Sequence, residues 1–245
     1  MPRTLGNAPR WLWERPIAHR GLHDDQRPEN SLAAFEAAAL AGDPIELDVH
    51  QSADGEVVVF HDDDLERMTG HAGTVTQTPF ETLRSLRLGD SEQTIPSLDQ
   101  VLDCVAGRVP VLVELKPPTV VGPLERAVCA VLERHRGEHA VQSFDPYSML
   151  WMRRHAPHIP RGLLSADMIE EDLPLHQIAG LRNLALAPLI RPDFVAYELW
   201  SLPYWAPSAW RRLGGLLLTW TVRDEGGLQR AREVADNVIF EYVRP

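Results

Sequence analysis

The sequence predicts an α/β protein of the (β/α)8 TIM-barrel class, with a small hairpin insertion after the second strand and a single domain over residues 1–245. Its 245 residues are close to the length typical of such a barrel, about 250 residues. Short apolar segments alternate with capped helical segments from near residue 17 onward, which indicates repeated βα units and a parallel sheet. The strand candidates are residues 17–19, 45–49, 111–115, 140–143, 162–164, 194–197, 216–221 and 238–240.

An open doubly wound sheet is the competing architecture for such an alternation of strands and helices. That fold usually carries a Gly-rich phosphate loop after its first strand. The residues after His19 contain no such loop. The eight strand candidates therefore favour a closed barrel.

Capping residues mark where the helices between these strands begin. Thr78 and Ser97 each precede a Glu or Gln three residues later, which is the spacing of a capping box. An apolar stripe with helical spacing follows Pro123, and Asp145 stands before a proline as an N-cap residue would. These patterns predict helices that pack one apolar face on the sheet.

One segment interrupts the alternation of strands and helices. Residues 52–55 read Ser-Ala-Asp-Gly and predict a tight turn, and residues 56–60 predict the second strand of a hairpin. This hairpin ends at His61, which is thereby returned toward Glu46 and Asp48.

The strands at 45–49 and 111–115 carry charge inside apolar runs. Glu46 and Asp48 are two residues apart, as are Glu114 and Lys116, so each pair points to one face of its strand. Ordinary amphipathic strands with one solvated face are the alternative explanation. Two such strands, with His-Arg-Gly and His-Asp nearby in the sequence, favour a functional site, because buried charge is costly unless a ligand uses it.

In a barrel, these side chains gather at the carboxyl ends of the strands, where catalytic groups are found. Three converging carboxylates repel one another unless a cation is present, and hard oxygen ligands suit Mg²⁺ or Ca²⁺ better than zinc. Arg20 and Lys116 add permanent positive charge that suits an anionic phosphate. His19 and His61 supply a base and an acid.

The overall charge of the chain narrows the classes of partner. Lys plus Arg is 24 and Asp plus Glu is 35, which gives a formal net charge of −11. This argues against a nucleic-acid-binding or anionic-membrane surface, although a locally positive pocket is compatible with it. No signal peptide or transmembrane run is apparent, so we expect a cytoplasmic protein without stable membrane insertion. Cys104 and Cys129 are expected to be buried free thiols rather than a disulfide.

The chain resembles the glycerophosphodiester phosphodiesterases in an ordered set of short motifs that runs from near residue 17 to the end. These motifs are His19-Arg20-Gly21, Pro28-Glu29-Asn30-Ser31, Glu46-Leu47-Asp48-Val49, Ser52-Ala53-Asp54-Gly55, His61-Asp62, Glu114-Leu115-Lys116, Gln142-Ser143-Phe144 and Trp220-Thr221-Val222. The resemblance implies a TIM barrel that hydrolyses a phosphodiester such as a deacylated phospholipid headgroup, releasing an alcohol and sn-glycerol 3-phosphate.

The resemblance also implies a role for each matching residue. Glu46, Asp48 and Glu114 correspond to metal ligands for a divalent cation, Mg²⁺ or Ca²⁺. His19 and His61 correspond to the general acid and base, and Arg20 and Lys116 to the groups that hold the phosphate.

Three further residues are predicted at the edge of the site. Glu29 and Asn30 match the Pro-Glu-Asn motif and are expected to orient His19 or a metal-bound water, with helix capping by Asn30 or Ser31 as the alternative. Trp220 is expected to form an aromatic wall against the glycerol moiety, with core packing as the alternative.

Two positions depart from the family pattern, and both lie toward the last strands. Arg223 stands where asparagine is common, and residues 237–241 replace a glycine-containing segment that ends in Thr-Asp. The acidic end of that segment survives as Glu241. These departures bear on substrate recognition more than on the class of reaction.

Several residues near the motifs are expected to have ordinary structural roles. Asp62, Asp63 and Asp64 are interpreted as a solvated loop rather than as further metal ligands. His50 is interpreted as a core or surface residue, because it has no partnered pattern.

Three other functions are alternatives to phosphodiester hydrolysis. One is a phospholipase-like phosphodiesterase or lyase of the same barrel superfamily, and another is a non-catalytic barrel that binds phosphorylated ligands. A metal-dependent amide hydrolase is the third, but such sites usually use several histidine ligands. Water and the glycerol 2-hydroxyl are both candidate nucleophiles, and headgroup preference and oligomeric state stay open.

Overall fold

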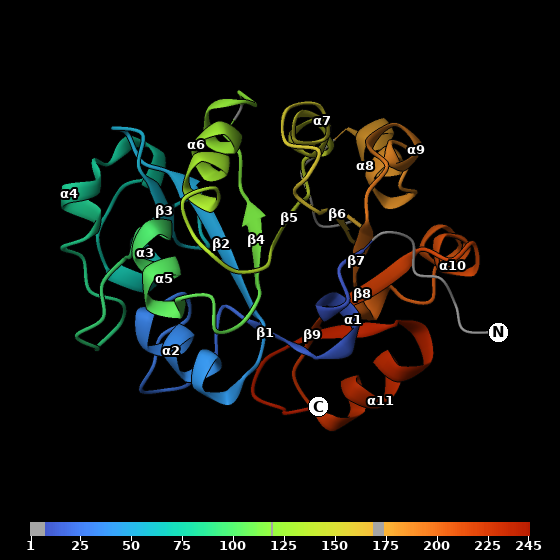
Figure 1. Cartoon of the computed structure of the whole chain (residues 1–245), viewed down its shortest axis with the longest axis horizontal. Helices are drawn as coiled ribbons and strands as arrows, with labels where there is room; N and C mark the ends of the chain where they lie inside the picture. Colours follow the sequence, from blue (N-terminus) through green and yellow to red (C-terminus); the bar gives the residue numbers. More distant parts are fainter. Residues whose placement is uncertain (1–7, 119, 169–173) are drawn as a thin grey trace. The chain divides into compact units, whose positions relative to one another are not determined.

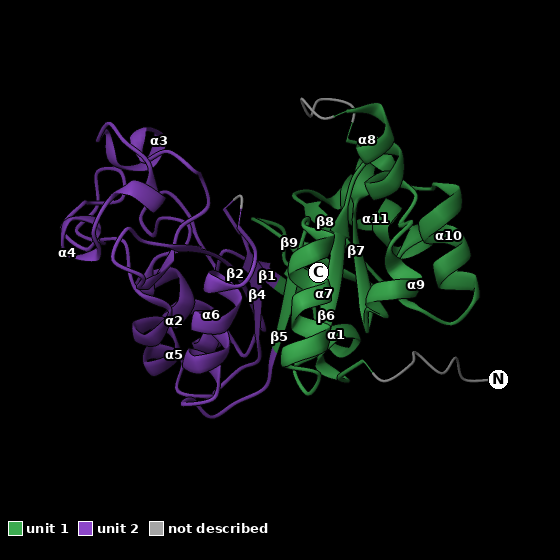
Figure 2. Ribbon diagram, turned by 90° about the horizontal axis from the view of Figure 1, so that it is seen from above, with its two compact units in different colours: residues 1–17, 140–245 green, residues 18–139 purple. Residues whose placement is uncertain are grey.

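The computed structural model describes residues 8–118, 120–168 and 174–245 (Figure 1). The chain divides into two compact units, which Figure 2 shows in green and purple. Unit 1 comprises residues 1–17 and 140–245, and unit 2 comprises residues 18–139. The prediction of a single domain over residues 1–245 stays a prediction.

Unit 2 contains the first strands and the predicted hairpin. Strand β2 (Ile45–Gln51) runs parallel to β1 (Ile17–His19) and to β4 (Val111–Leu115), and antiparallel to β3 (Val57–Val59). The helices of this unit are α2 (Leu32–Ala41), α3 (Glu66–Thr69), η1 (Val75–Gln77), α4 (Phe80–Leu83), α5 (Leu98–Val105) and α6 (Pro123–Leu132). The hairpin insertion after the second strand is therefore confirmed.

The segment after this hairpin has its own apolar core. Side chains from β3, the following loop and α4 pack together, and all of them are buried. They are Val58, Phe60, Leu65, Val75, Leu83, Leu88 and Ile95. This core fixes the loop that leaves β3 and thus the segment that carries His61.

Unit 1 continues the alternation of strands and helices. Its strands β5 (His139–Ser143), β6 (Arg161–Ser165), β7 (Phe194–Glu198), β8 (Leu216–Val222) and β9 (Asn237–Phe240) pair in parallel in chain order. The helices are α1 (Trp11–Glu14), α7 (Pro146–His155), α8 (Leu175–Arg182), α9 (Ala187–Ile190), η2 (Leu199–Ser201), α10 (Trp205–Arg212) and α11 (Glu225–Val234). Eight parallel strands with intervening helices in the described part of the chain confirm the (β/α)8 class.

The predicted caps are confirmed at two helices and wrong at one. Ser97 and Gln100 form a reciprocal capping box at α5, and the Asp145 side chain accepts a hydrogen bond from the Tyr147 amide at α7. Thr78 does not cap α4, because its hydroxyl donates to the Thr74 carbonyl. The Phe80 amide instead donates to Asp54 in the hairpin turn, at 3.0 Å.

The two cysteines and the helix lengths bear on two further predictions. Cys104 and Cys129 are both free thiols, as predicted, but only Cys129 is buried, because the Cys104 side chain is half-buried beside Glu36. Across residues 8–118, 120–168 and 174–245, none of the helices has the length and apolar character needed to cross a bilayer.

Candidate active site

The strand register in unit 2 brings the three predicted carboxylates together. Asp48 on β2 pairs with Glu114 on β4, and Glu46 on β2 pairs with His19 on β1. Glu46 and Asp48 share one face because side chains alternate along a strand. One oxygen from each of Glu46, Asp48 and Glu114 lies within 4.8 Å of the others, and all three residues are buried.

Two permanent cations lie against this acidic triad, as the motifs predicted. Lys116 Nζ lies 2.8 Å from Glu114 Oε1 and 3.3 Å from Asp48 Oδ1. Arg20 Nε lies 3.3 Å from Asp48 Oδ2, and the Arg20 amide donates to Glu46 Oε2 at 3.3 Å. Three carboxylates and two cations leave a formal local charge near −1, so the site has capacity for further positive charge.

The loop after β1 is shaped to deliver Arg20 and Asn30 to this site. Both residues have left-handed backbone conformations, with φ angles of 55° and 56°. Gly21 follows at a φ of 81°, and a Cβ there would lie 2.8 Å from the Ala34 backbone, so the close approach of this loop to α2 requires glycine. The local backbone therefore sets where the Arg20 side chain starts.

Asn30 contacts the acidic triad, whereas Ser31 takes the capping role that was the alternative. Asn30 Nδ2 donates to Asp48 Oδ2 at 2.9 Å, and Asn30 Oδ1 accepts from the Asp48 amide at 3.4 Å. Ser31 is the N-cap of α2, where its hydroxyl accepts from the Ala34 amide. Asn30 thus orients a carboxylate of the triad rather than capping the helix.

The pKa values of the three carboxyl groups of the triad are shifted in different directions. Burial, together with the neighbouring carboxylates, raises the pKa of Glu46, and burial raises the pKa of Glu114. Burial also acts to raise the pKa of Asp48, but Lys116 and Arg20 outweigh it and hold that pKa below its ordinary value. Among the described residues, no group donates a hydrogen bond of good geometry to the buried Asp48 Oδ1. A buried oxygen of this kind, between two further carboxylates, fits a divalent metal site.

The two predicted histidines lie in different surroundings. His19 is buried, with Nε2 3.8 Å from Glu46 Oε2. His61 follows β3, and its Nδ1 lies 2.6 Å from Asp62 Oδ1. Burial lowers the pKa of His61, while Asp48 acts in the opposite direction. His61 is the more accessible of the two, with a side chain that is 33% exposed.

Some residues at this site were not predicted from the sequence. Asp62 was interpreted as part of a solvated loop, but it holds the His61 ring. His50 is buried on β2, and its Nε2 lies 3.1 Å from the His61 carbonyl oxygen, so it supports the backbone of the catalytic candidate. The carboxylate directly after His61 was the signal available in the sequence for the first of these contacts.

Trp220 and the two departures from the family pattern lie in unit 1. Trp220 is on β8, and its ring meets Phe144 edge to face, with centroids 5.5 Å apart. Arg223 Nε donates to Glu241 Oε2 at 2.7 Å, so the residue that replaces the usual asparagine forms an ion pair with the retained acidic end of the other segment. The role of Trp220 in substrate contact stays a prediction.

Carboxylates that fit a metal, flanked by fixed cations and imidazoles at the ends of parallel strands, are suited to an enzyme that cleaves phosphate esters. Residues 19–240 match the model of the Glycerophosphoryl diester phosphodiesterase family. A glycerophosphodiester phosphodiesterase of Caldanaerobacter subterraneus subsp. tengcongensis is 30% identical over 228 residues, covering 87% of this chain and 88% of that protein. The chain therefore belongs to this family of phosphoric diester hydrolases.

Solved structures agree with this assignment. A phosphodiesterase from Oleispira antarctica, in complex with the product sn-glycerol-3-phosphate, is 25% identical, with a TM-score of 0.80 over 94% of this chain and 93% of that chain. A glycerophosphodiester phosphodiesterase from Thermotoga maritima shares the fold, with a TM-score of 0.69 and 24% identity over 93% of this chain and 94% of that chain.

Proposed function

We propose that this protein hydrolyses glycerophosphodiesters to an alcohol and sn-glycerol 3-phosphate, with Mg²⁺ or Ca²⁺ as its metal. The observation that carries this proposal is the convergence of Glu46, Asp48 and Glu114 between Arg20 and Lys116. The complex of the Oleispira antarctica relative with sn-glycerol-3-phosphate supports the choice of substrate.

Glu46, Asp48 and Glu114 would hold the metal. Their donor atoms are hard oxygens, which suit Mg²⁺ and Ca²⁺ better than softer metals. When bound, the metal would neutralise phosphate charge and polarise a phosphoryl oxygen. Asn30 contributes by fixing the orientation of Asp48 through its amide.

Arg20 and Lys116 hold the phosphate in this proposal. Both side chains are already oriented by carboxylates, Arg20 by Asp48 and Glu29 and Lys116 by Asp48 and Glu114. Fixed donors of this kind stabilise the charge that builds on phosphate oxygens without a further cost of reorganisation. Their positive charge is retained, because the same carboxylates raise the pKa of both cations.

His19 and His61 transfer the protons. A carboxylate has no hydrogen to donate, so the 2.6 Å contact with ionised Asp62 places the ring hydrogen of His61 on Nδ1. Nε2 of His61 is then the atom that exchanges a proton with the nucleophile or the leaving alcoholate. His19 takes the complementary role, and positioned groups of this kind each contribute roughly 10²–10⁴-fold to the rate.

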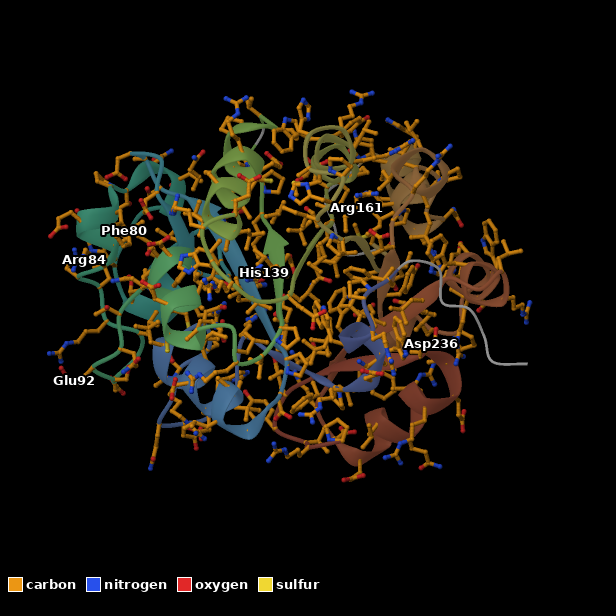
Figure 3. The ribbon with its side chains drawn as sticks, in the orientation of Figure 1. Phe80, Arg84, Glu92, His139, Arg161 and Asp236 are labelled. Carbon is orange, nitrogen blue, oxygen red and sulfur yellow. The ribbon has the colours of Figure 1, made fainter. Side chains whose placement is uncertain are left out.

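The first test is release of glycerol 3-phosphate from a panel of glycerophosphodiesters, in EDTA and after addition of Mg²⁺, Ca²⁺ or Mn²⁺. We expect no release in EDTA and restored release with a divalent metal. No release with any metal, despite detectable binding of phosphate compounds, would favour a non-catalytic barrel. Glu92→Gln is a matched control for triad variants, because Glu92 (labelled in Figure 3) is an exposed acid that pairs with Arg87.

A second measurement separates the two candidate nucleophiles. A substrate analogue without the glycerol 2-hydroxyl reacts only if water attacks phosphorus directly. Turnover of this analogue at a rate close to that of the natural diester supports direct attack by water. Loss of turnover, with a cyclic phosphate visible by phosphorus NMR for the natural diester, supports the cyclic route.

A further inference from the structure

Arg67 on the short helix α3 bridges two carboxylates beside the candidate active site. Its Nε lies 2.5 Å from Asp62 Oδ2, and its Nη2 lies 3.0 Å from Asp62 Oδ1. Nη2 also donates to Glu29 Oε1 at 2.7 Å, and Nη1 donates to Glu29 Oε2 at 3.2 Å. One guanidinium therefore makes a paired contact with each of two acids that lie far apart in the sequence.

Each of these acids also holds a residue of the proposed machinery. Asp62 Oδ1 accepts from His61 Nδ1 at 2.6 Å, and Glu29 Oε1 accepts from Arg20 Nη1 at 2.8 Å. The contacts form one continuous chain from the imidazole to the phosphate-holding guanidinium, with Arg67 at its centre. No other contact described above links His61 to Arg20 through side chains alone.

The backbone that carries Arg67 is fixed by the core after the hairpin. Leu65, directly before α3, is fully buried in that core. The Gly89 amide donates to the Met68 carbonyl at 2.7 Å, and the Thr69 hydroxyl donates to the Leu65 carbonyl at 2.7 Å. This anchoring gives the Arg67 side chain a defined origin, although its side chain is 47% exposed.

The charge states agree with such a bridge. Burial raises the pKa of Asp62, but hydrogen bonds from Arg67 and His61 outweigh it and lower that pKa to about 2. Burial also acts to raise the pKa of Glu29, but Arg67 and Arg20 lower it below its ordinary value. Both acids are therefore ionised near neutral pH and can only accept hydrogen bonds.

We propose that Arg67 is a positioning residue that sets the His61 ring through Asp62 and the Arg20 guanidinium through Glu29. Partly exposed ion pairs of this kind contribute little to stability, so the main effect of Arg67 is on geometry. Lysine is a poor substitute, because a point charge on a flexible stem does not reproduce two paired contacts. The kinetic consequences rest on the proposed function.

The kinetic test compares Arg67→Ala and Arg67→Lys with the wild type, each with saturating metal. We expect Arg67→Ala to lower kcat/KM by about 10–100-fold, as loss of a group that orients catalytic residues commonly does, and Arg67→Lys to restore little of it. Arg84→Ala is the matched control, because Arg84 is an exposed arginine on the same unit that pairs with Glu81 (Figure 3), and it should stay within twofold. Arg67→Ala with activity within twofold of the wild type overturns the inference.

Asp62→Asn and Glu29→Gln test separately the contacts from Arg67 to His61 and from Arg67 to Arg20. Asp62→Asn should mainly lower kcat, because it releases the imidazole, and Glu29→Gln should mainly raise KM, because it releases the phosphate-holding guanidinium. The effect of each change and the effect of Arg67→Ala should be less than additive, because Arg67 acts on His61 only through Asp62 and on Arg20 only through Glu29. Fully additive effects overturn the inference.

A readout without turnover separates this inference from the proposed function. Nitrogen-15 NMR of the histidine rings reports which nitrogen carries the hydrogen, and His61→Gln identifies the His61 signals. We expect hydrogen on Nδ1 in the wild type and a mixture of tautomers in Arg67→Ala. If the wild type hydrolyses none of the substrates, the proposed function fails, but the NMR comparison still tests the role of Arg67. An unchanged His61 tautomer in Arg67→Ala overturns the inference.

Discussion

Buried polar side chains on β2 and β4 differ from those on β7 and β8 in what satisfies them. On β7 and β8, the Tyr197 hydroxyl donates to the carbonyls of Ala166 and Arg182, and the Thr219 hydroxyl donates to the Tyr197 carbonyl. On β2 and β4, Asp48 and Glu114 lie against the charged groups of Arg20 and Lys116, and the Asn30 amide also donates to Asp48. Backbone partners serve stability, whereas clustered like charges reduce it.

This difference distinguishes buried polar side chains that serve a functional site from those that only stabilise the fold. A hydroxyl that donates its hydrogen to a carbonyl has only acceptor capacity left, and it carries no charge to attract a cation. The acidic triad retains capacity for a cation, because burial raises the pKa of Glu46 and Glu114 and one oxygen from each of the three carboxylates lies within 4.8 Å of the others. Variants in the triad should therefore affect activity and stability in opposite directions, and variants on β7 should affect stability alone.

The largest effect is expected from Glu46→Gln. Activity should fall at least about 10²-fold, because the metal loses a ligand and charge neutralisation. In EDTA at pH 7.5 the variant should unfold at a higher temperature than the wild type, because one of three buried like charges is gone. The raised pKa of Glu46 means that its destabilising charge disappears at low pH, so the difference in thermal midpoint should shrink at pH 4.5. A variant that is less stable than the wild type in EDTA at pH 7.5 would break the comparison.

His61→Ala should have the next largest effect on activity. Loss of a positioned acid or base lowers kcat by about 10²–10⁴-fold. The ring is partly exposed and lies outside the apolar core, so the thermal midpoint should change little. Steady-state kinetics and thermal unfolding of the same preparation check both statements. Near wild-type turnover would remove His61 from the mechanism.

Much of this site was predictable because its signals are local. Side-chain alternation places Glu46 and Asp48 on one strand face, and parallel pairing of neighbouring strands brings Glu114 to them. The (β/α)8 class followed from the same regularity, since strand and helix periods and capping residues are read within a few residues. Helix α5 shows this well, because its capping box involves only Ser97 and Gln100.

The remaining features depend on contacts between distant segments. Arg67 and Glu29 are 38 residues apart, and nothing in the local pattern of either residue indicates their pairing. Thr78 shows the same effect at a helix end, because Asp54 from the hairpin turn takes the place of the predicted cap. Arg223 and Glu241, which directly follow β8 and β9, form an ion pair that neither local sequence indicates. Irregular loops select such partners through the tertiary fold.

Tyr197→Phe tests the other side of the comparison, with a moderate effect. Removing a hydroxyl whose single hydrogen is shared between two carbonyls should lower stability by about 0.5–1.5 kcal/mol, the usual contribution of one hydrogen bond. Burial raises the pKa of Tyr197 to about 12, so its neutral hydroxyl stabilises the fold at pH values below the ordinary tyrosine pKa. That contribution is lost as the pH rises through about 12. The free energy of unfolding of the variant should therefore fall less steeply at alkaline pH than that of the wild type. A fall in kcat for Tyr197→Phe would contradict the assignment of β7 to stability.

The smallest effect is expected from Ser97→Ala in unit 2. Its hydroxyl accepts from the Gln100 amide at 3.2 Å, and loss of such a cap costs about 1 kcal/mol. Ser85→Ala is the control, because the Ser85 hydroxyl donates to the Thr82 carbonyl in an exposed turn and its loss should cost less. Urea unfolding measures both costs, and kcat should be unchanged in both variants. If Ser97→Ala lowered kcat, the functional region of unit 2 would extend beyond the acidic triad and its loops to the cap of α5.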